Sequence, residues 1–214
     1  MSHRLATPRD TPVNVHTQRH PVAGPAGAIE CAVDAPAGVA RGVAVLCHPH
    51  PLHGGTMDNK VVQTLARALV QVGWRAVRFN FRGIGASQGG WDGGRGEVDD
   101  ALAVVAAHRD AALPLVLGGF SFGGYVASQA AARLDPPAQR LLLVAPATGN
   151  FDVAAVPEDT LVIHGESDDV VPLAATLDWA RPQALPVVVV PGVGHFFHGR
   201  LPLLKSIVVR AFAV

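Results

Sequence analysis

A serine between two glycines is the first feature of this sequence that could do chemistry. Ser121 stands at the centre of Gly119-Phe120-Ser121-Phe122-Gly123, after an apolar run typical of a strand and before an alanine-rich run typical of a helix. A turn this sharp leaves no room for side chains beside the serine, which explains the two glycines. The spacing therefore predicts a hydroxyl raised above the end of a sheet, as a nucleophile that attacks a carbonyl carbon.

A serine hydroxyl needs a base to accept its proton, and a third group must orient that base. Asp168 and His195 each lie just after a predicted strand, downstream of Ser121. The carboxyl ends of parallel strands meet at one edge of a sheet, so both side chains can reach the serine. Asp168 would fix the imidazole tautomer, and His195 would act as general base and then as general acid.

Two further carboxylates compete with Asp168 for the role of the acid. Asp169 is its immediate neighbour, and Asp152 follows the next strand beyond the serine. We prefer Asp168 because of its position after the strand, and we keep the other two as alternatives.

An anionic tetrahedral intermediate would need hydrogen-bond donors. The backbone N–H of Phe122 lies at the start of the predicted helix, where N–H groups have no partner within the helix. A second donor is expected from the loop after the strand Gly42–Cys47. Pro49 and Pro51 have no N–H, and the remaining candidates in this loop are His50, Leu52 and His53.

Strands alternate with amphipathic helices along most of the chain, which predicts an α/β fold with a mostly parallel, twisted sheet of about eight strands flanked by helices. The first two strands, joined by a turn at Pro21–Gly27, would form an antiparallel edge. Helices are expected from Asp58 or Asn59 to Gly73, from about Glu97, over Tyr125–Leu134 and over Leu203–Phe212. The expected strands are Val13–His20, Ala28–Asp34, Gly42–Cys47, Arg75–Phe81, Leu113–Gly119, Arg140–Ala145, Thr160–His164 and Pro186–Val190.

The length of 214 residues predicts one domain over residues 1–214, with residues 1–13 as a loose N-terminal tail. The segment 146–159, between two strands, is too short for a cap domain, so the site should be open on that side.

Composition and charge exclude several classes of function. Lys+Arg and Asp+Glu number 17 each, so no charge imbalance favours nucleic acid or an anionic membrane. Two cysteines indicate no disulfide framework. No apolar run has the length of a membrane span, and the first residues lack a signal-peptide core. A cytoplasmic protein is expected.

Several blocks in a fixed order resemble the α/β-hydrolase superfamily over residues 42–212. The most specific block is His-Pro-x-x-x-x-Gly-Gly-x-Met-x-Asn-Lys-Val-Val, at residues 48–62, which is similar to that of small, lidless bacterial hydrolases. Further similar blocks lie at residues 78–87, 96–100, 164–168 and 195–198. The resemblance implies ester hydrolysis by a Ser121–Asp168–His195 triad, without a cofactor. It also implies that the backbone N–H of His50 is the second oxyanion donor.

Other residues near these motifs are expected to line a substrate pocket, or else to have plainer roles. His48, His50 and His53 crowd together, but no Cys or carboxylate sits at ligand spacing in their loop, so we expect no metal. Cys47 is expected to be a buried thiol. The candidates for the pocket are Leu52, His53, Phe120, Trp91 and His198, although Phe120 could pack beneath the serine and His198 could lie on the surface.

The sequence therefore predicts a serine hydrolase that cleaves a small-molecule carboxylic ester through an acyl-enzyme. A thioesterase, a peptidase or a perhydrolase could use the same triad. A protein that keeps the fold only to bind a ligand is the alternative from a different class. The sequence leaves the oligomeric state open.

Overall fold

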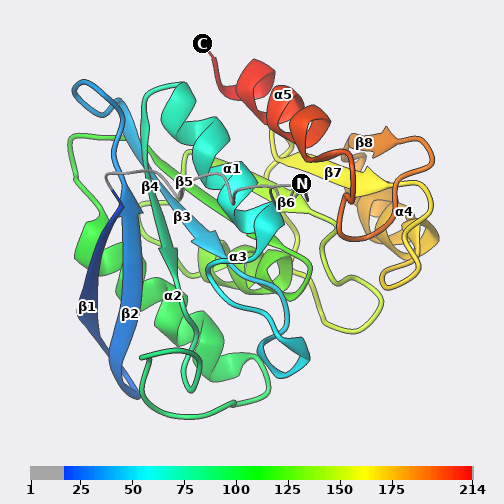
Figure 1. The fold of residues 1–214 in the computed structure, drawn as a ribbon. Helices are drawn as coiled ribbons and strands as arrows, with labels where there is room; N and C mark the ends of the chain where they lie inside the picture. The colour runs from blue at the N-terminus through cyan, green and yellow to red at the C-terminus, as the bar shows by residue number, and fades with distance from the viewer. Residues whose placement is uncertain (1–16, 214) are drawn as a thin grey trace, which may run out of the picture.

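Eight strands form one sheet, in the order β1-β2-β4-β3-β5-β6-β7-β8, in the computed structural model (Figure 1), which describes residues 17–213. β1 pairs with β2 and β2 with β4 in antiparallel fashion, and all other pairs are parallel. The predicted fold class, with its antiparallel edge, is confirmed. The strands are β1 (Gln18–Gly24), β2 (Gly27–Asp34), β3 (Gly42–Cys47), β4 (Trp74–Phe79), β5 (Leu115–Phe120), β6 (Arg140–Val144), β7 (Leu161–Gly165) and β8 (Val187–Val190).

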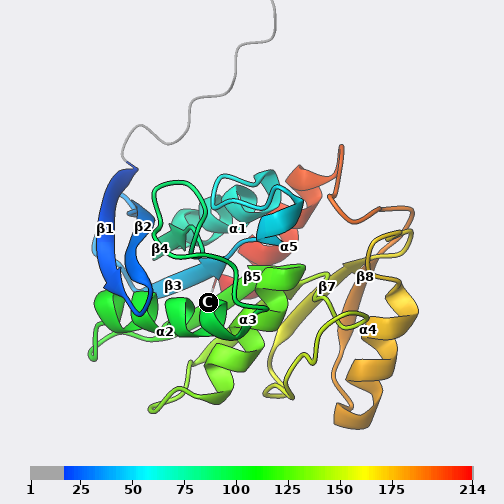
Figure 2. The same cartoon turned by 90° about the horizontal axis from the view of Figure 1, so that it is seen from below.

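Helices cover both faces of the sheet (Figures 1 and 2). α1 and α5 lie together on one face, and α2 and α3 lie together on the other. None of the helices within residues 17–213 is long and apolar enough to cross a membrane. The helices are α1 (Lys60–Gln71), α2 (Arg95–His108), α3 (Phe122–Ala132), α4 (Leu173–Ala180) and α5 (Leu201–Phe212).

The alternation of side chains along β3 explains why the two large apolar clusters lie on opposite faces of the sheet. Val43 and Val45 pack with α2 and α3, whereas Ala44 and Leu46 pack with α1 and α5. Successive residues of a strand point to opposite faces. A strand with helices on both faces therefore needs a continuous apolar run, as this one has.

At the level of secondary structure one prediction is wrong and one helix is missed. The turn expected at Pro21–Gly27 is shorter, because β1 continues to Gly24. Pro21 is tolerated since β1 is an edge strand. The short helix α4 was not predicted, and only Thr176 and Ala180 of it are buried, so its apolar periodicity is weak. The tail at residues 1–13 and the first part of the strand expected from Val13 lie outside the described residues, and other boundaries differ by a few residues.

The turn between β5 and α3 requires its glycines. Ser121 has φ 56° and ψ −119°, a backbone conformation that a residue with a side chain rarely adopts. A Cβ atom on Gly119 would lie 2.1 Å from the carbonyl oxygen of Gly123. A Cβ atom on Gly123 would lie 2.2 Å from the carbonyl oxygen of Cys47. The first turn of α3 therefore packs directly on the end of β3.

The imidazole of His48 joins the loop after β3 to the loop after β4. Its Nε2 accepts a hydrogen bond from the backbone N–H of Phe81 at 3.1 Å. Its Nδ1, 2.7 Å from the carbonyl oxygen of Pro49, must then carry the proton and donate. Burial lowers the pKa of His48 to about 4, so the ring is neutral at pH 7.

A buried arginine supports the start of α1. Arg78 of β4 is 2% exposed and bonds to the Asp34 carboxylate at 3.1 Å. It also donates to the carbonyl oxygen of Met57 at 2.9 Å and to the Asp58 carboxylate at 3.0 Å. The Asn59 side chain then accepts from the N–H groups of Val61 and Val62, so of the two predicted caps Asn59 is the one used.

Replacement of Gly123 by alanine should destabilise the fold by about 1–3 kcal/mol or more, because the backbone of Cys47 cannot move away from the new methyl group. The matched control is Gly90→Ala, where a Cβ atom meets nothing within 4 Å. Urea unfolding measures both changes. An unchanged unfolding midpoint for Gly123→Ala would contradict the close contact.

His48 should make stability depend on pH. The unfolded imidazole binds a proton below a pKa of about 6.5, while the folded one does so only near 4. The free energy of unfolding should therefore fall by up to about 3 kcal/mol as the pH drops from about 6.5 to 4. In His48→Gln this slope should be shallower, and in the exposed-site control His198→Gln it should persist. Equal slopes in all three proteins would refute the assignment.

Candidate functional site

Ser121 lies at the carboxyl end of β5, in the middle of the sheet. β5 is flanked by β3 and β6, so loops from both sides converge on the serine. The N–H of Ser121 bonds to the carbonyl oxygen of Val144 at 2.9 Å, which ties the turn to the end of β6. The serine is 7% exposed. This is the raised position at a helix start that the sequence predicts.

Asp168 and His195 come together from different loops. His195 Nδ1 donates to Asp168 Oδ2 at 2.7 Å, and both side chains are buried. Asp168 Oδ1 accepts from the N–H groups of Val170 and Val171, at 2.9 and 2.7 Å. Burial alone would raise the pKa of the Asp168 carboxyl, but the bonds from His195, Val171 and Val170 outweigh it and hold the pKa below its ordinary value. The carboxylate is thus charged and fixed in orientation.

The two alternative acids lie elsewhere. Asp169 is exposed, and its side chain makes no hydrogen bond to His195 in the described part of the chain. Asp152 is also exposed, and its backbone carbonyl accepts from the side chain of Gln129. Of the three carboxylates, only Asp168 is bonded to the imidazole.

The ring of His195 lies beside the serine turn. Its centroid is 4.8 Å from that of Phe120, the residue before Ser121. Within residues 17–213 no hydrogen bond occupies His195 Nε2 or Ser121 Oγ. A serine–histidine bond is often long in an unliganded protein and tightens when substrate binds. Both atoms are therefore unoccupied by other groups of the described residues.

A hydrogen bond within the loop after β3 excludes one of the three candidates for the second oxyanion donor. The N–H of His53 already bonds to the carbonyl oxygen of His50 at 3.1 Å, which leaves the N–H groups of His50 and Leu52. Phe122 is the first residue of α3, and its N–H has no acceptor in the described chain. The pair of donors predicted from the sequence, His50 and Phe122, stays a prediction.

The side chain of His50 lies in an aromatic cluster that the sequence did not predict in full. Its ring centroid is 4.4 Å from His53, 4.7 Å from Trp91 and 5.1 Å from Phe122. Phe151 continues the cluster at 5.0 Å from Phe122. Of the predicted pocket residues, Trp91 and His53 therefore lie beside the start of α3.

The remaining predicted pocket residues are spread around the turn. Phe120 is fully buried and packs against His195 and Phe196, so its ring supports the site from below. Leu52 is 62% exposed. His198 is exposed and stacks on Phe196, with ring centroids 5.7 Å apart. Phe196, itself 43% exposed, was not predicted and forms this side of the rim.

The loop that carries Trp91 is held by a buried carboxylate. Glu97, in the first turn of α2, is fully buried and accepts from the N–H groups of Asp92 and Gly94, at 3.0 and 2.8 Å. A carboxylate near a helix start also interacts favourably with the helix dipole. Glu97 therefore fixes the backbone next to Trp91.

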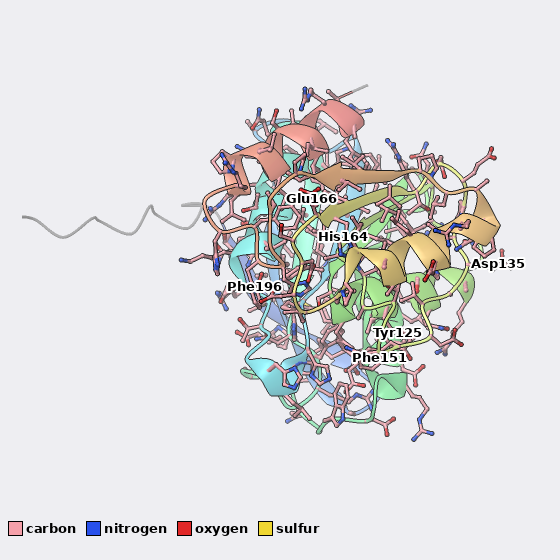
Figure 3. All side chains as sticks on the ribbon, turned by 90° about the vertical axis from the view of Figure 1, so that its right-hand side faces the viewer. Tyr125, Asp135, Phe151, His164, Glu166 and Phe196 are labelled. Carbon is pink, nitrogen blue, oxygen red and sulfur yellow. The ribbon has the colours of Figure 1, made fainter. Side chains whose placement is uncertain are left out.

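A second histidine, His164, contacts the candidate acid. His164 is fully buried, and its Nε2 lies 2.9 Å from the carbonyl oxygen of Val171 and 3.4 Å from Asp168 Oδ2. Burial lowers the pKa of His164. Figure 3 shows His164 and Phe196 on the same side of the molecule as Tyr125 and Phe151. The sequence signal for His164 is the strand-end run His164-Gly165-Glu166-Ser167-Asp168.

The histidine-rich loop is not built as a metal site. Within residues 17–213 no three His, Cys, Asp or Glu side chains gather as metal ligands. His48 uses both ring nitrogens on the protein backbone, and His50 packs among aromatic rings. Cys47 is fully buried at the end of β3, as predicted, and its burial raises the pKa of its thiol.

Comparison with known proteins identifies the family. A family model described as "Serine aminopeptidase, S33" matches residues 41–156. A solved α/β serine hydrolase without a lid, from Xanthomonas campestris, is 39% identical, with a TM-score of 0.85 over 94% of this chain and 96% of that one. A serine hydrolase homologue from Coxiella burnetii is also 39% identical, with a TM-score of 0.79 over 94% of this chain and 99% of that one.

An uncharacterised protein of Rickettsia prowazekii is 35% identical over 158 residues, which span 69% of this chain and 66% of that protein, just under two thirds of its length. Like the lidless hydrolase from Xanthomonas campestris, this chain has no cap domain, because only residues 145–160 separate β6 from β7. The chain belongs to the α/β-hydrolase superfamily, among its small serine hydrolases without a lid.

Proposed function

We propose that this protein cleaves a carboxylic ester through an acyl-enzyme formed on Ser121. The observation that carries the proposal is the 2.7 Å bond between His195 and Asp168, formed beside a serine whose backbone is held at φ 56°. A buried carboxylate on Nδ1 leaves the other imidazole nitrogen, Nε2, as the proton acceptor. That is the tautomer that a base for Ser121 needs.

In the proposed reaction Ser121 Oγ attacks the ester carbonyl carbon while His195 Nε2 takes the hydroxyl proton. The carbonyl oxygen becomes an oxyanion, which the N–H groups of His50 and Phe122 stabilise. Asp168 stabilises the imidazolium that forms. The intermediate collapses, and His195 returns the proton to the departing alkoxide, which leaves as an alcohol.

Water completes the proposed cycle. His195 removes a proton from a water molecule as its oxygen attacks the acyl carbon. A second tetrahedral intermediate then expels Ser121 Oγ, which recovers the proton from His195. The products are a carboxylic acid and the free enzyme. Every step uses groups of this chain, the substrate and water, so the proposed reaction requires no cofactor.

Peptide-bond cleavage is the second candidate function, because the matching family model is described as a serine aminopeptidase. The same groups would attack an amide, but the amine is a poorer leaving group and depends more on protonation by His195. Short p-nitrophenyl esters and aminoacyl p-nitroanilides, assayed side by side, distinguish the two. Faster turnover of the anilides would show that peptide-bond cleavage, and not ester cleavage, is the function.

Ser121→Ala should abolish hydrolysis, with a loss of at least about 10³-fold, while the protein still folds. A fluorophosphonate probe followed by intact-mass measurement should give one adduct with the unaltered protein and none with the variant. Full activity in a folded Ser121→Ala protein would refute the mechanism. The absence of any adduct on the unaltered protein would favour a fold kept for binding alone.

Asp168→Asn should lower kcat by up to about 10⁴-fold, because a neutral amide does not stabilise the imidazolium and its NH2 group can donate to Nδ1, which favours the wrong imidazole tautomer. Asp169→Asn, at the exposed neighbouring carboxylate, is the matched control and should retain activity within about two-fold. Steady-state kinetics on one ester measures both variants. If they lost activity equally, Asp168 would not be the acid.

A further inference from the structure

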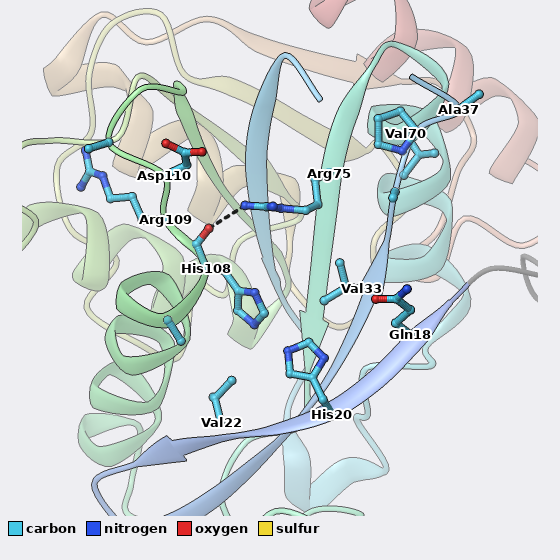
Figure 4. Close-up of a pocket in the computed structure, with 14 residues that line it drawn as sticks. Gln18, His20, Val22, Val33, Ala37, Val70, Arg75, His108, Arg109 and Asp110 are labelled. Carbon is cyan, nitrogen blue, oxygen red and sulfur yellow. Dashed lines mark hydrogen bonds between the residues drawn. The ribbon is translucent and has the colours of Figure 1, made fainter. Parts of the chain in front are cut away.

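A cavity of about 1240 Å³ lies away from the proposed active site (Figure 4). Arg75, near the start of β4, and His108, at the end of α2, are among its lining residues. Ser121, Asp168 and His195 instead follow the carboxyl ends of parallel strands. The cavity therefore lies near the amino ends of the parallel strands, whereas the proposed active site lies at their carboxyl ends. No step of the proposed reaction uses the cavity.

Two histidines and an arginine form its polar wall. The rings of His20 and His108 lie 5.1 Å apart, on β1 and at the end of α2. Arg75 Nη2 donates to the carbonyl oxygen of His108 at 2.9 Å. Arg75 Nε and His108 Nε2 are buried and have no hydrogen-bond partner among the described residues. Buried polar groups without partners are rare in proteins, and a ligand is one explanation for them.

The charge of Arg75 is not balanced within the cavity. No ion pair joins Arg75 to a carboxylate in the described chain. The guanidinium of Arg109 donates to the carbonyl oxygens of Pro136 and Pro137, and it points away from the histidines in Figure 4. The Asp110 carboxylate accepts from the N–H of Ala112. One permanent positive charge therefore remains available.

Apart from Gln18, Arg109 and Asp110, the rest of the wall is apolar. Val22 and Val33 lie on the adjacent strands β1 and β2, and Val70 lies near the end of α1. Small residues from the connections after β2 and α2 complete this surface. A ligand with one anionic end and an apolar body would match both parts of the cavity.

We propose that this cavity binds a small organic carboxylate, with its charged group on Arg75 and His108 and its apolar body against Val22 and Val33. One uncompensated cation matches one carboxylate charge, and the two unpartnered nitrogens match its two oxygens. In the proposed complex the His108 ring and the Arg75 side chain rotate, so that these nitrogens, which are buried in the free protein, face the cavity. His20, whose ring is tilted against that of His108, forms the outer edge of the anion site.

The probe is sodium hexanoate, with hexanamide as its uncharged counterpart, and the readout is the imidazole NMR signals of His20 and His108. Burial, together with His20 and Arg75, lowers the pKa of His108 in the free protein. The facing charged groups are His20 on β1, Arg75 on β4, and Arg109 and Asp110 after α2. Hexanoate should raise the pKa of His108, because an adjacent anion favours the imidazolium, and hexanamide should not.

All measurements use the Ser121→Ala protein, so the result does not depend on the proposed hydrolysis. Arg75→Gln should weaken hexanoate binding by about ten-fold or more. Its matched control, Arg109→Gln, should bind within about two-fold, because that guanidinium is already used on carbonyl oxygens. His20→Gln changes an exposed side chain, leaves the core intact and should also weaken binding.

Three results would overturn the proposal. The first is the absence of any change in the His20 and His108 signals at saturating hexanoate in the folded protein. The second is equal binding by Arg75→Gln and Arg109→Gln. The third is a response to inorganic phosphate as large as that to hexanoate, which would show a site for the anionic group alone.

Discussion

The close contact between the first turn of α3 and the end of β3 is the constraint on which the site depends. The backbone of Gly123 meets the carbonyl oxygen of Cys47 with no space for a methyl group. This contact sets Ser121 at the end of the sheet with a backbone conformation that costs about 1–3 kcal/mol by itself. The surrounding β-strands over-determine that conformation, because the N–H of Ser121 is also held by Val144 of β6.

Much of this arrangement could be predicted from the sequence because the determining signals are local. Each signal spans only a few residues of the sequence. The signals are the two glycines around Ser121, the continuous apolar run of β3, and the polar residues that follow β7 and β8. In a parallel sheet the carboxyl ends of the strands lie at the same edge, so the residues that follow these strands come together. Asp168 and His195 accordingly meet as expected.

What the sequence could not show depends on contacts between distant segments. Nothing in the sequence around Arg78 distinguishes it from other arginines in strands. Its ion pairs with Asp34 of β2 and with Asp58 before α1 form only in the folded chain. His164 reads as part of a strand end, and only the folded loop places it against Asp168. Only Thr176 and Ala180 of α4 are buried, and the helix lacks the apolar periodicity that marks α1. The cavity beside His108 is assembled from several separate elements.

The division of the apolar interior by the sheet has a consequence for how substitutions combine. α1 and α5 share one core, and α2 and α3 share the other, with the backbone of the sheet between them. Side chains in different cores do not touch, so the effects of their substitutions on stability should add, whereas neighbours within one core should couple. Substitutions in the layer of α2 and α3 would act on the helix that begins beside Ser121, whereas those in the layer of α1 and α5 would act through Phe120, whose ring packs against His195.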